Sequence, residues 1–293
     1  MRSTKIENLA LARMPADAER TIGAILFNSG KITGADVVRA LRLQKKEGLR
    51  FGEACVKLGF VTTADIDQAV SEQFKYPYLP PGESGLSNEL VVANNPVSPQ
   101  VEALRDLRTQ LLVRWFNLER KVLAICSPAR SDGRSYLAAN LALSFSQLGR
   151  NTLLIDGDMR QPRQHQIFNL DSREGLSTAL AGRASGTCVQ PVAHFPKLSV
   201  LPTGPVPPNP LDLLSRSEFP HLLDELKQRF DVVLIDTPAA ALGADAQMIA
   251  LHAGGALMLA CEGQTRLKDL HILAAGIASG NAVIVGSVYN RLR

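Results

Sequence analysis

The sequence of 293 residues lacks any apolar run long enough to cross a membrane, and its amino terminus, MRSTKIENLA, is polar. A membrane-spanning helix needs about 20 mostly apolar residues, and a secretory signal needs a hydrophobic core, so neither segment is predicted. We therefore expect a cytoplasmic protein that reaches the inner face of the membrane only through a partner. The formal net charge is only +4, and basic residues are not clustered, which argues against nucleic-acid binding.

Cysteine and histidine are also scarce, with four and five residues respectively. The cysteines are scattered in mostly apolar contexts without a CxxC or Cys/His spacing, which excludes a zinc motif and a disulfide framework. We expect free, buried thiols. The apolar fraction of 45% is ordinary for a soluble protein, and the length suggests two domains.

An internal repeat occupies the first part of the chain. Residues 21–44 align without a gap with residues 50–73, and glycines and glutamines match between the copies. Each copy has the pattern of a short helix ended by Gly30 or Gly59, then a turn and a second amphipathic helix. Two such hairpins predict a small all-α domain.

Residues 122–140 change from an apolar run to a small polar loop and then to a helical pattern. The loop ends in Gly133, Arg134 and Ser135, where a Walker A loop has Gly, Lys and Ser or Thr. Such a loop holds phosphates with backbone N–H groups, and its hydroxyl ligates Mg²⁺. The candidate nucleotide-binding residues are Ser131, Asp132, Gly133, Arg134, Ser135, Tyr136 and Asp236.

Three carboxylates follow apolar runs of strand character. Asp156 and Asp158 come at the end of TLLIDGD, and Asp236 at the end of FDVVLID. Ligand sites of open parallel sheets lie at the carboxyl ends of strands, and Mg²⁺ needs only one or two carboxylates beside phosphate and water. We take Ser135, Asp156 and Asp236 as metal candidates.

Further strands are expected at residues 198–202, 255–261 and 281–290, with helical patterns between them. Near-continuous apolar strands that alternate with helices predict an α/β fold, a P-loop NTPase-like, mostly parallel sheet with helices on both faces. The predicted organisation is a lead-in over residues 1–19, a helical repeat domain over 20–78, a linker rich in Pro, Gly, Ser and Asn over 79–100, and a nucleotide-binding domain over 101–293.

Residues from about 88 to 293 resemble the cytoplasmic bacterial tyrosine kinases of exopolysaccharide and capsule export, of the chain-length-determinant-associated type. The motifs that carry the resemblance are EALRDLR (102–108), SPARSDGRSYLAANLA (127–142), LLIDGDMRQPRQHQIFNL (153–170), GLSTALAG (175–182), LPTGPVPPNPLDLL (201–214) and DVVLIDTPA (231–239). Two features depart from the family pattern. Arg134 replaces the Walker A Lys, which keeps the charge but not the shape, and a tyrosine-rich tail is missing.

The resemblance implies ATP and Mg²⁺ as cofactors, with Asp156 and Asp158 in the second acidic motif and Asp236 in Walker B. It also implies Asp156, Asp158 and Arg134 as the catalytic candidates. It also implies a transmembrane chain-length determinant, or polysaccharide co-polymerase, as partner, and a homo-oligomer. Glu102, Arg105 and Arg108 match the oligomerisation motif of the family, although their spacing alone indicates an ion-pair ladder on a solvated helix face.

The repeat resembles the N-terminal domain of type II secretion and pilus assembly ATPases, whose paired motifs bind cyclic di-GMP in some members. The family motif opens with Arg-Leu-Gly; the second copy has Arg50-Phe51-Gly52, whereas the first has Thr21 after Arg20. The candidates for this effector are Arg20, Gly23, Gly30, Arg50, Gly52 and Gly59. A helical docking module is the alternative.

Three functions stay open from the sequence. The first is an ATP-dependent protein-tyrosine kinase in exopolysaccharide chain-length control and export, tuned by cyclic di-GMP. The second is a catalytically weak or inactive ATP-binding regulator that docks a membrane co-polymerase. The third is a partitioning-type P-loop ATPase, whose extra loop lysine would fall at Ala129.

Overall fold

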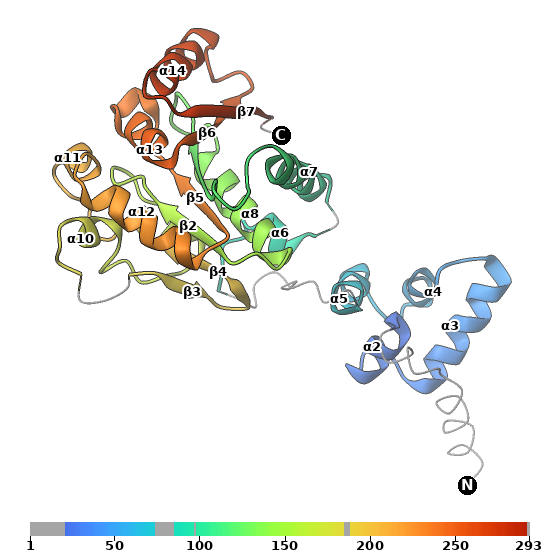
Figure 1. Ribbon diagram of the computed structural model, residues 1–293. Helices are drawn as coiled ribbons and strands as arrows, with labels where there is room; N and C mark the ends of the chain where they lie inside the picture. Colours follow the sequence, from blue (N-terminus) through green and yellow to red (C-terminus); the bar gives the residue numbers. More distant parts are fainter. Residues whose placement is uncertain (1–20, 74–84, 97, 185–187, 292–293) are drawn as a thin grey trace. The chain divides into compact units, whose positions relative to one another are not determined.

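A computed structural model describes residues 21–73, 85–96, 98–184 and 188–291. The chain divides into two compact units, residues 1–80 and 81–293 (Figure 1). The predicted lead-in, Arg20 and the linker segment 79–84 lie outside the described residues. Within the ranges described, no helix has the length and apolar character needed to cross a membrane.

The first unit is built from the two sequence repeats. Its helices are α2 (Ile22–Asn28), α3 (Gly34–Glu47), α4 (Phe51–Lys57) and α5 (Thr63–Gln73). Gly30 and Gly59 both have φ of 72°, which confirms the predicted glycine turns after α2 and α4. However, α2 packs mainly against α5, and α3 against α4. The two copies therefore interleave their helices instead of forming two separate hairpins.

The second unit contains a seven-stranded sheet with the order β3-β4-β2-β5-β1-β6-β7. The strands are β1 (Val122–Cys126), β2 (Thr152–Asp156), β3 (Gln190–Val192), β4 (Phe195–Leu201), β5 (Val232–Asp236), β6 (Gly255–Cys261) and β7 (Val283–Asn290). Neighbouring strands are parallel except β3, which runs antiparallel to β4. This confirms the predicted fold class, although β3 was not predicted.

Helices cover both faces of this sheet (Figure 1). They are α6 (Val91–Asn94), α7 (Pro99–Arg114), α8 (Arg134–Gln147), α9 (Gln164–Ile167), α10 (Leu176–Leu180), α11 (Pro210–Leu214), α12 (Glu218–Arg229), α13 (Asp245–Ala253), α14 (Leu267–Ser279) and the 3₁₀ helix η2 (Ala240–Leu242). The central helix α8 packs against β1, β2, β4 and β5 on one face, whereas α12 and α13 pack against β5 and β1.

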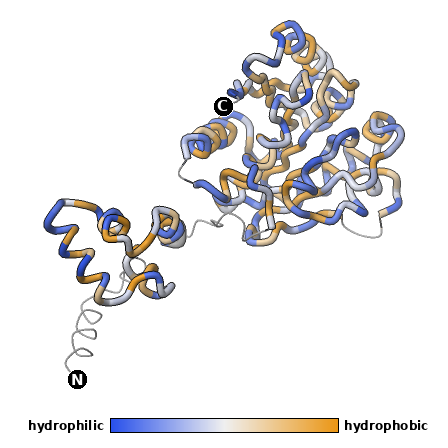
Figure 2. The backbone as a smooth tube through the Cα atoms, turned by 180° about the vertical axis from the view of Figure 1, so that it is seen from behind, coloured by the Kyte–Doolittle hydropathy of each residue, from blue (hydrophilic) through white to orange (hydrophobic). Residues whose placement is uncertain are grey.

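The central strands β1, β2 and β5 are buried along their whole length. Hydrophobic residues follow these inner strands, and hydrophilic residues lie mainly on the outside of the unit (Figure 2). Burial on both faces explains why the strands have continuous apolar sequences without alternation. The polar residues that end β2 and β5 are direct neighbours, because Asp156 pairs in register with Asp236.

The predicted linker differs from the structure in its second half. The segment around α6 is bound to α8, because the Asn140 side chain accepts from Val92 N at 3.1 Å and donates to the Glu89 carbonyl at 2.8 Å. Asn140 is fully buried. Residues 89–92 of the predicted linker are therefore part of the nucleotide unit, to which the Gln147 side chain and the Arg163–Glu89 ion pair also join them.

Candidate functional site

The loop between β1 and α8 has the backbone shape of an anion cradle. Ser131 and Gly133 have positive φ angles of 59° and 100°, whereas their neighbours in the loop have negative φ angles. The backbone N–H groups of residues 131–136 make no hydrogen bond to another group in the part of the chain that the structure describes. Successive unpaired N–H groups in such a turn, at the start of a 14-residue helix, attract phosphate oxygens.

Arg134 points into this loop, where it bonds to protein acceptors. Its Nε donates to the Thr237 carbonyl at 2.8 Å, and its Nη1 donates to Ser127 Oγ and to the Ala129 carbonyl. The residue is only 7% exposed. The guanidinium therefore connects the phosphate loop to the end of β5, a contact that its place in the motif does not reveal.

The two carboxylates that end β2 and β5 meet beside the loop. Asp156 Oδ2 accepts from the backbone N–H groups of Arg163 and Gln164 at 3.0 and 2.9 Å. The Gln164 side chain then donates to Asp236 Oδ2 at 2.8 Å and to the Ser135 carbonyl at 3.1 Å. Three of the predicted residues are thus held at one edge by Gln164, which sequence reasoning missed because a glutamine in a polar run carries no distinctive signal.

Three buried oxygens at this edge have no hydrogen-bond partner among the residues that the structure describes, namely Asp156 Oδ1, Asp236 Oδ1 and Gln164 Oε1. Burial raises the pKa of Asp156 well above its ordinary value, and the Asp236 charge adds to the shift. Burial also raises the pKa of Asp236 to about 6, although the Arg134 charge partly offsets it. Buried unpaired acceptors with raised pKa values are the environment that a bound cation would stabilise.

These groups fit Mg²⁺ better than a transition metal. In the described residues, no group of three or more His, Cys, Asp or Glu side chains is arranged to hold a metal. A site with two carboxylates and the Ser135 hydroxyl suits Mg²⁺, which keeps water and substrate phosphates among its ligands. The residues present therefore fit a Mg²⁺-nucleotide complex.

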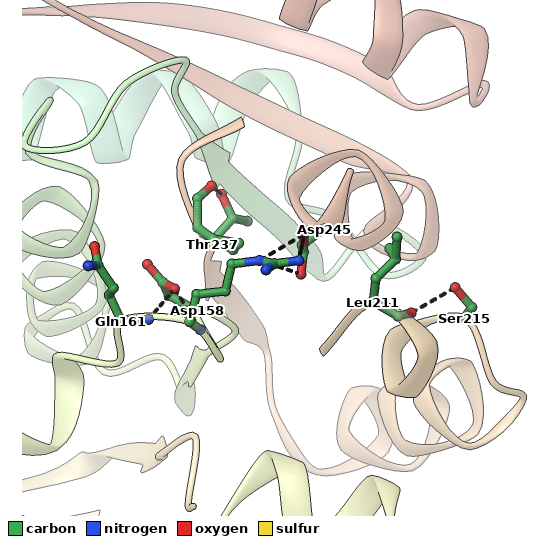
Figure 3. Close-up of polar contacts among 8 residues, drawn as sticks. Asp158, Gln161, Leu211, Ser215, Thr237 and Asp245 are labelled. Carbon is green, nitrogen blue, oxygen red and sulfur yellow. Dashed lines mark hydrogen bonds and ion pairs between the residues drawn. The ribbon is translucent and has the colours of Figure 1, made fainter. Parts of the chain in front are cut away.

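Asp158 lies on the loop after β2. Its Oδ1 accepts from the backbone N–H groups of Arg160 and Gln161 at 3.1 and 2.8 Å (Figure 3). The Arg160 guanidinium in turn forms a bidentate ion pair with the buried Asp245 at the start of α13, with 3.0 Å between Nη2 and Oδ2. The loop that carries Asp158 is thereby anchored to a helix 85 residues away in sequence.

Gly157 lets the two acidic strand ends approach each other. Its N–H donates to the Asp236 carbonyl at 2.9 Å, and a Cβ at this position would lie 2.7 Å from the same oxygen. Only glycine fits this distance without a backbone shift. Tyr136, the other predicted loop residue, is half-buried, and burial raises its pKa.

The residues of the predicted oligomerisation motif have different surroundings. Glu102 and Arg105 form an ion pair within α7. Arg108 instead donates to the Ser144 carbonyl on α8 at 2.8 Å, so it joins two helices of the same unit. The ion pair that the spacing indicates is therefore present between Glu102 and Arg105, whereas Arg108 bonds to another helix instead.

In the helical unit, Thr21 and Arg50 occupy equivalent exposed positions at the starts of α2 and α4. The Thr21 hydroxyl accepts from Ala24 N at 3.3 Å, whereas the Arg50 backbone N–H donates to the Glu53 carboxylate at 2.8 Å. Thr21 therefore caps its helix with the side chain, and Arg50 keeps its guanidinium outside the capping contact.

The matched glycines of this unit have a packing role. A Cβ on Gly23 would lie 3.3 Å from the Phe51 ring, and one on Gly52 would lie 3.1 Å from Ile66 Cγ2. Both contacts are tighter than ordinary van der Waals separations. Close helix packing thus explains these two glycines without a ligand, while Arg20 lies outside the described residues.

No family model matches the chain. The tyrosine-protein kinase wzc of Salmonella typhimurium is 33% identical over 206 residues, which cover 70% of this chain and 28% of that protein. The putative tyrosine-protein kinase CapB of Staphylococcus aureus is 31% identical over 203 residues, 69% of this chain and 89% of CapB.

Two solved structures are also similar. The kinase domain of the Escherichia coli tyrosine kinase ETK has a TM-score of 0.66 and 28% identity, covering 74% of this chain and 81% of that one. The Pyrococcus furiosus cell division ATPase MinD has a TM-score of 0.52 and 26% identity over 58% of this chain and 72% of that one. Both structures share the P-loop architecture with this chain, one being a tyrosine kinase and the other a cell division ATPase. The sequence identity to the kinase CapB extends over 89% of that protein and therefore assigns the family. The chain belongs to the bacterial tyrosine-protein kinases.

Proposed function

We propose that this protein transfers phosphate from ATP to protein tyrosine. The observation that supports it most is the set of three unpaired buried oxygens beside a loop with free N–H groups. The oxygens can accept a metal cation, and the N–H groups of the loop can donate to the phosphates that this cation binds.

Each part of the site has a proposed role. The N–H groups of residues 131–136 and the Arg134 charge would hold the phosphates, while Ser135, Asp156 and Asp236 would hold Mg²⁺. When bound, Mg²⁺ neutralises negative charge on the phosphate oxygens. Asp158 accepts the proton of the tyrosine hydroxyl, and its two backbone hydrogen bonds orient the carboxylate for this transfer.

Nucleotide binding is tested by titration calorimetry on the full chain. We expect one molecule of Mg²⁺-ADP per chain, and an affinity at least about tenfold lower when the metal is removed with a chelator, because the phosphates would then face the carboxylates without a cation. A folded sample that releases no heat with ADP or ATP in the presence of Mg²⁺ would refute the proposal.

A non-catalytic ATP-binding regulator is the second candidate, and one observation favours it. Arg134 already binds three protein acceptors, so it is less free to follow the transferred phosphoryl group than a lysine would be. Phosphotyrosine production by a sample that binds Mg²⁺-ATP separates the two candidates, since a regulator binds without turnover.

We further propose that the protein acts in exopolysaccharide export, self-associates, and is recruited to the membrane by a transmembrane co-polymerase, as the resemblance in sequence implies. Arg105 on α7 is the better test of self-association, because Arg108 contributes to the fold through Ser144. We expect Arg105→Glu to lower the mass measured by light scattering at low salt, since it places a like charge beside Glu102. The exposed Arg114 on the same helix provides the control Arg114→Glu. An Arg105→Glu variant with unchanged mass would contradict this role.

The helical unit is proposed to bind cyclic di-GMP weakly, through Arg50 and a weakened equivalent position at Thr21. Loss of one charged contact typically costs about 1.5–3 kcal/mol, or roughly ten- to a hundredfold in affinity. We therefore expect Thr21→Arg to strengthen binding and Arg50→Ala to abolish it, whereas Arg42→Ala on the exposed face of α3 leaves it unchanged. If neither the wild type nor Thr21→Arg binds in calorimetry, the unit is a docking module.

A further inference from the structure

Two side chains of the phosphate loop bind the same residue from opposite sides. The Ala129 backbone N–H donates to Asp132 Oδ2 at 2.8 Å, and the Ala129 carbonyl accepts from Arg134 Nη1. Asp132 is fully buried, and Arg134 is nearly so. The peptide groups on both sides of Ala129 are therefore held by side chains of the loop itself.

Asp132 also connects the loop to the far edge of the sheet. Its Oδ1 accepts from the Thr265 hydroxyl at 2.9 Å, and its backbone carbonyl accepts from the Asn290 amide at 2.9 Å. Thr265 follows β6 and Asn290 ends β7. The carboxylate is thus fixed by tertiary contacts, so it is a rigid acceptor for Ala129.

Arg134 supplies the second set of connections. Its Nε reaches the Thr237 carbonyl after β5, while Nη1 reaches Ser127 and Ala129. The fork of a guanidinium can serve these separated acceptors together, whereas a lysine has a single nitrogen. Among the described residues, no carboxylate lies within ion-pair distance of Arg134. Its positive charge therefore remains available to an anion.

We propose that Asp132 and Arg134 act as positioning residues that hold the loop in its phosphate-binding shape through Ala129. In this chain the arginine then holds the loop in shape, and the lysine usual in a Walker A motif would hold it less firmly. The effect on nucleotide affinity rests on the function proposed above, but the hydrogen bonds that hold Ala129 do not depend on it.

The first measurement is amide exchange at Ala129 by NMR in the full chain without nucleotide. We expect Asp132→Ala to accelerate exchange by at least about tenfold, because it removes the acceptor of this N–H. Arg134→Lys should accelerate it less, by releasing the carbonyl on the other side. Thr265→Val keeps the side-chain shape but removes the donor to Asp132, and it should also accelerate exchange. Arg130→Lys makes the same chemical change at an exposed loop position and should have no effect.

The second measurement is Mg²⁺-ADP affinity by calorimetry. Asp132→Ala and Arg134→Lys should each weaken binding about tenfold, and the double variant should be little weaker than either, because both act through Ala129. Arg130→Lys should bind normally. A tighter-binding Arg134→Lys with unchanged Ala129 exchange would overturn the proposal, and so would unchanged exchange in Asp132→Ala. If neither the wild type nor any variant binds nucleotide, the proposed function fails. The exchange rates would still show whether Asp132 and Arg134 hold Ala129 in place.

Discussion

Replacing Asp158 with Asn is expected to lower the rate of tyrosine phosphorylation by about 10²- to 10⁴-fold, the usual contribution of a general base. The amide oxygen can still accept from the N–H groups of Arg160 and Gln161, so the loop should keep its conformation. We therefore expect kcat to fall while KM for ATP and the affinity for Mg²⁺-ADP stay within about threefold.

The measurement is the initial rate of phosphotyrosine formation, combined with calorimetry on the same samples. Asp269→Asn, an exposed carboxylate on α14, is the matched control and should have wild-type kinetics. An Asp158→Asn variant that phosphorylates tyrosine at the wild-type rate would remove Asp158 from the mechanism. A variant that loses nucleotide affinity instead would identify Asp158 as a binding residue.

Replacing Asp236 with Asn is expected to stabilise the protein in the absence of metal and to abolish its stabilisation by Mg²⁺-ADP. Asp236 is fully buried, and its pKa is raised from 3.8 to about 6 in the folded protein. The folded state therefore binds more protons than the unfolded state between about pH 4 and 6. The protonated Asp236 side chain therefore stabilises the folded state fully below pH 4, and this stabilisation is lost as the pH rises through 6. The free energy of unfolding falls by about 3 kcal/mol over this range.

Thermal unfolding against pH tests this expectation. In metal-free buffer at pH 8, Asp236→Asn should unfold several degrees above the wild type, since about 1 kcal/mol corresponds to roughly 2–4 °C for a protein of this size. Asp231→Asn, at the exposed opposite end of β5, is the control and should not shift the unfolding temperature by that amount. An Asp236→Asn variant that is less stable at pH 8 would show that the buried carboxylate does not destabilise the metal-free protein. A variant that is still stabilised by Mg²⁺-ADP would show that Asp236 does not hold the metal.

The packing of the repeat helices and the contacts of residues 89–92 are two features of this chain that sequence patterns did not predict. The helices α2 and α4 end just before the predicted glycine turns at Gly30 and Gly59. Which helix packs against which depends on long-range complementarity of their faces, and the pattern of one copy holds no information about it. Likewise, the polar and proline-rich composition of residues 79–100 indicates a boundary. The buried Asn140 that binds Val92 is 48 residues away, so local composition cannot predict this contact.

The sequence by itself determined the parallel α/β fold, the phosphate loop and the acidic residues at the strand ends. These depend on local signals, because apolar runs, glycine positions and motif spacing act over a few residues. Tertiary structure alone decided that Gln164 joins Asp236 to Ser135, that Arg160 reaches Asp245, and that Arg134 turns toward Thr237. The physical reason is that a hydrogen-bonding side chain takes the acceptors that folding brings within about 3 Å, and these lie on strands and loops far apart in the chain.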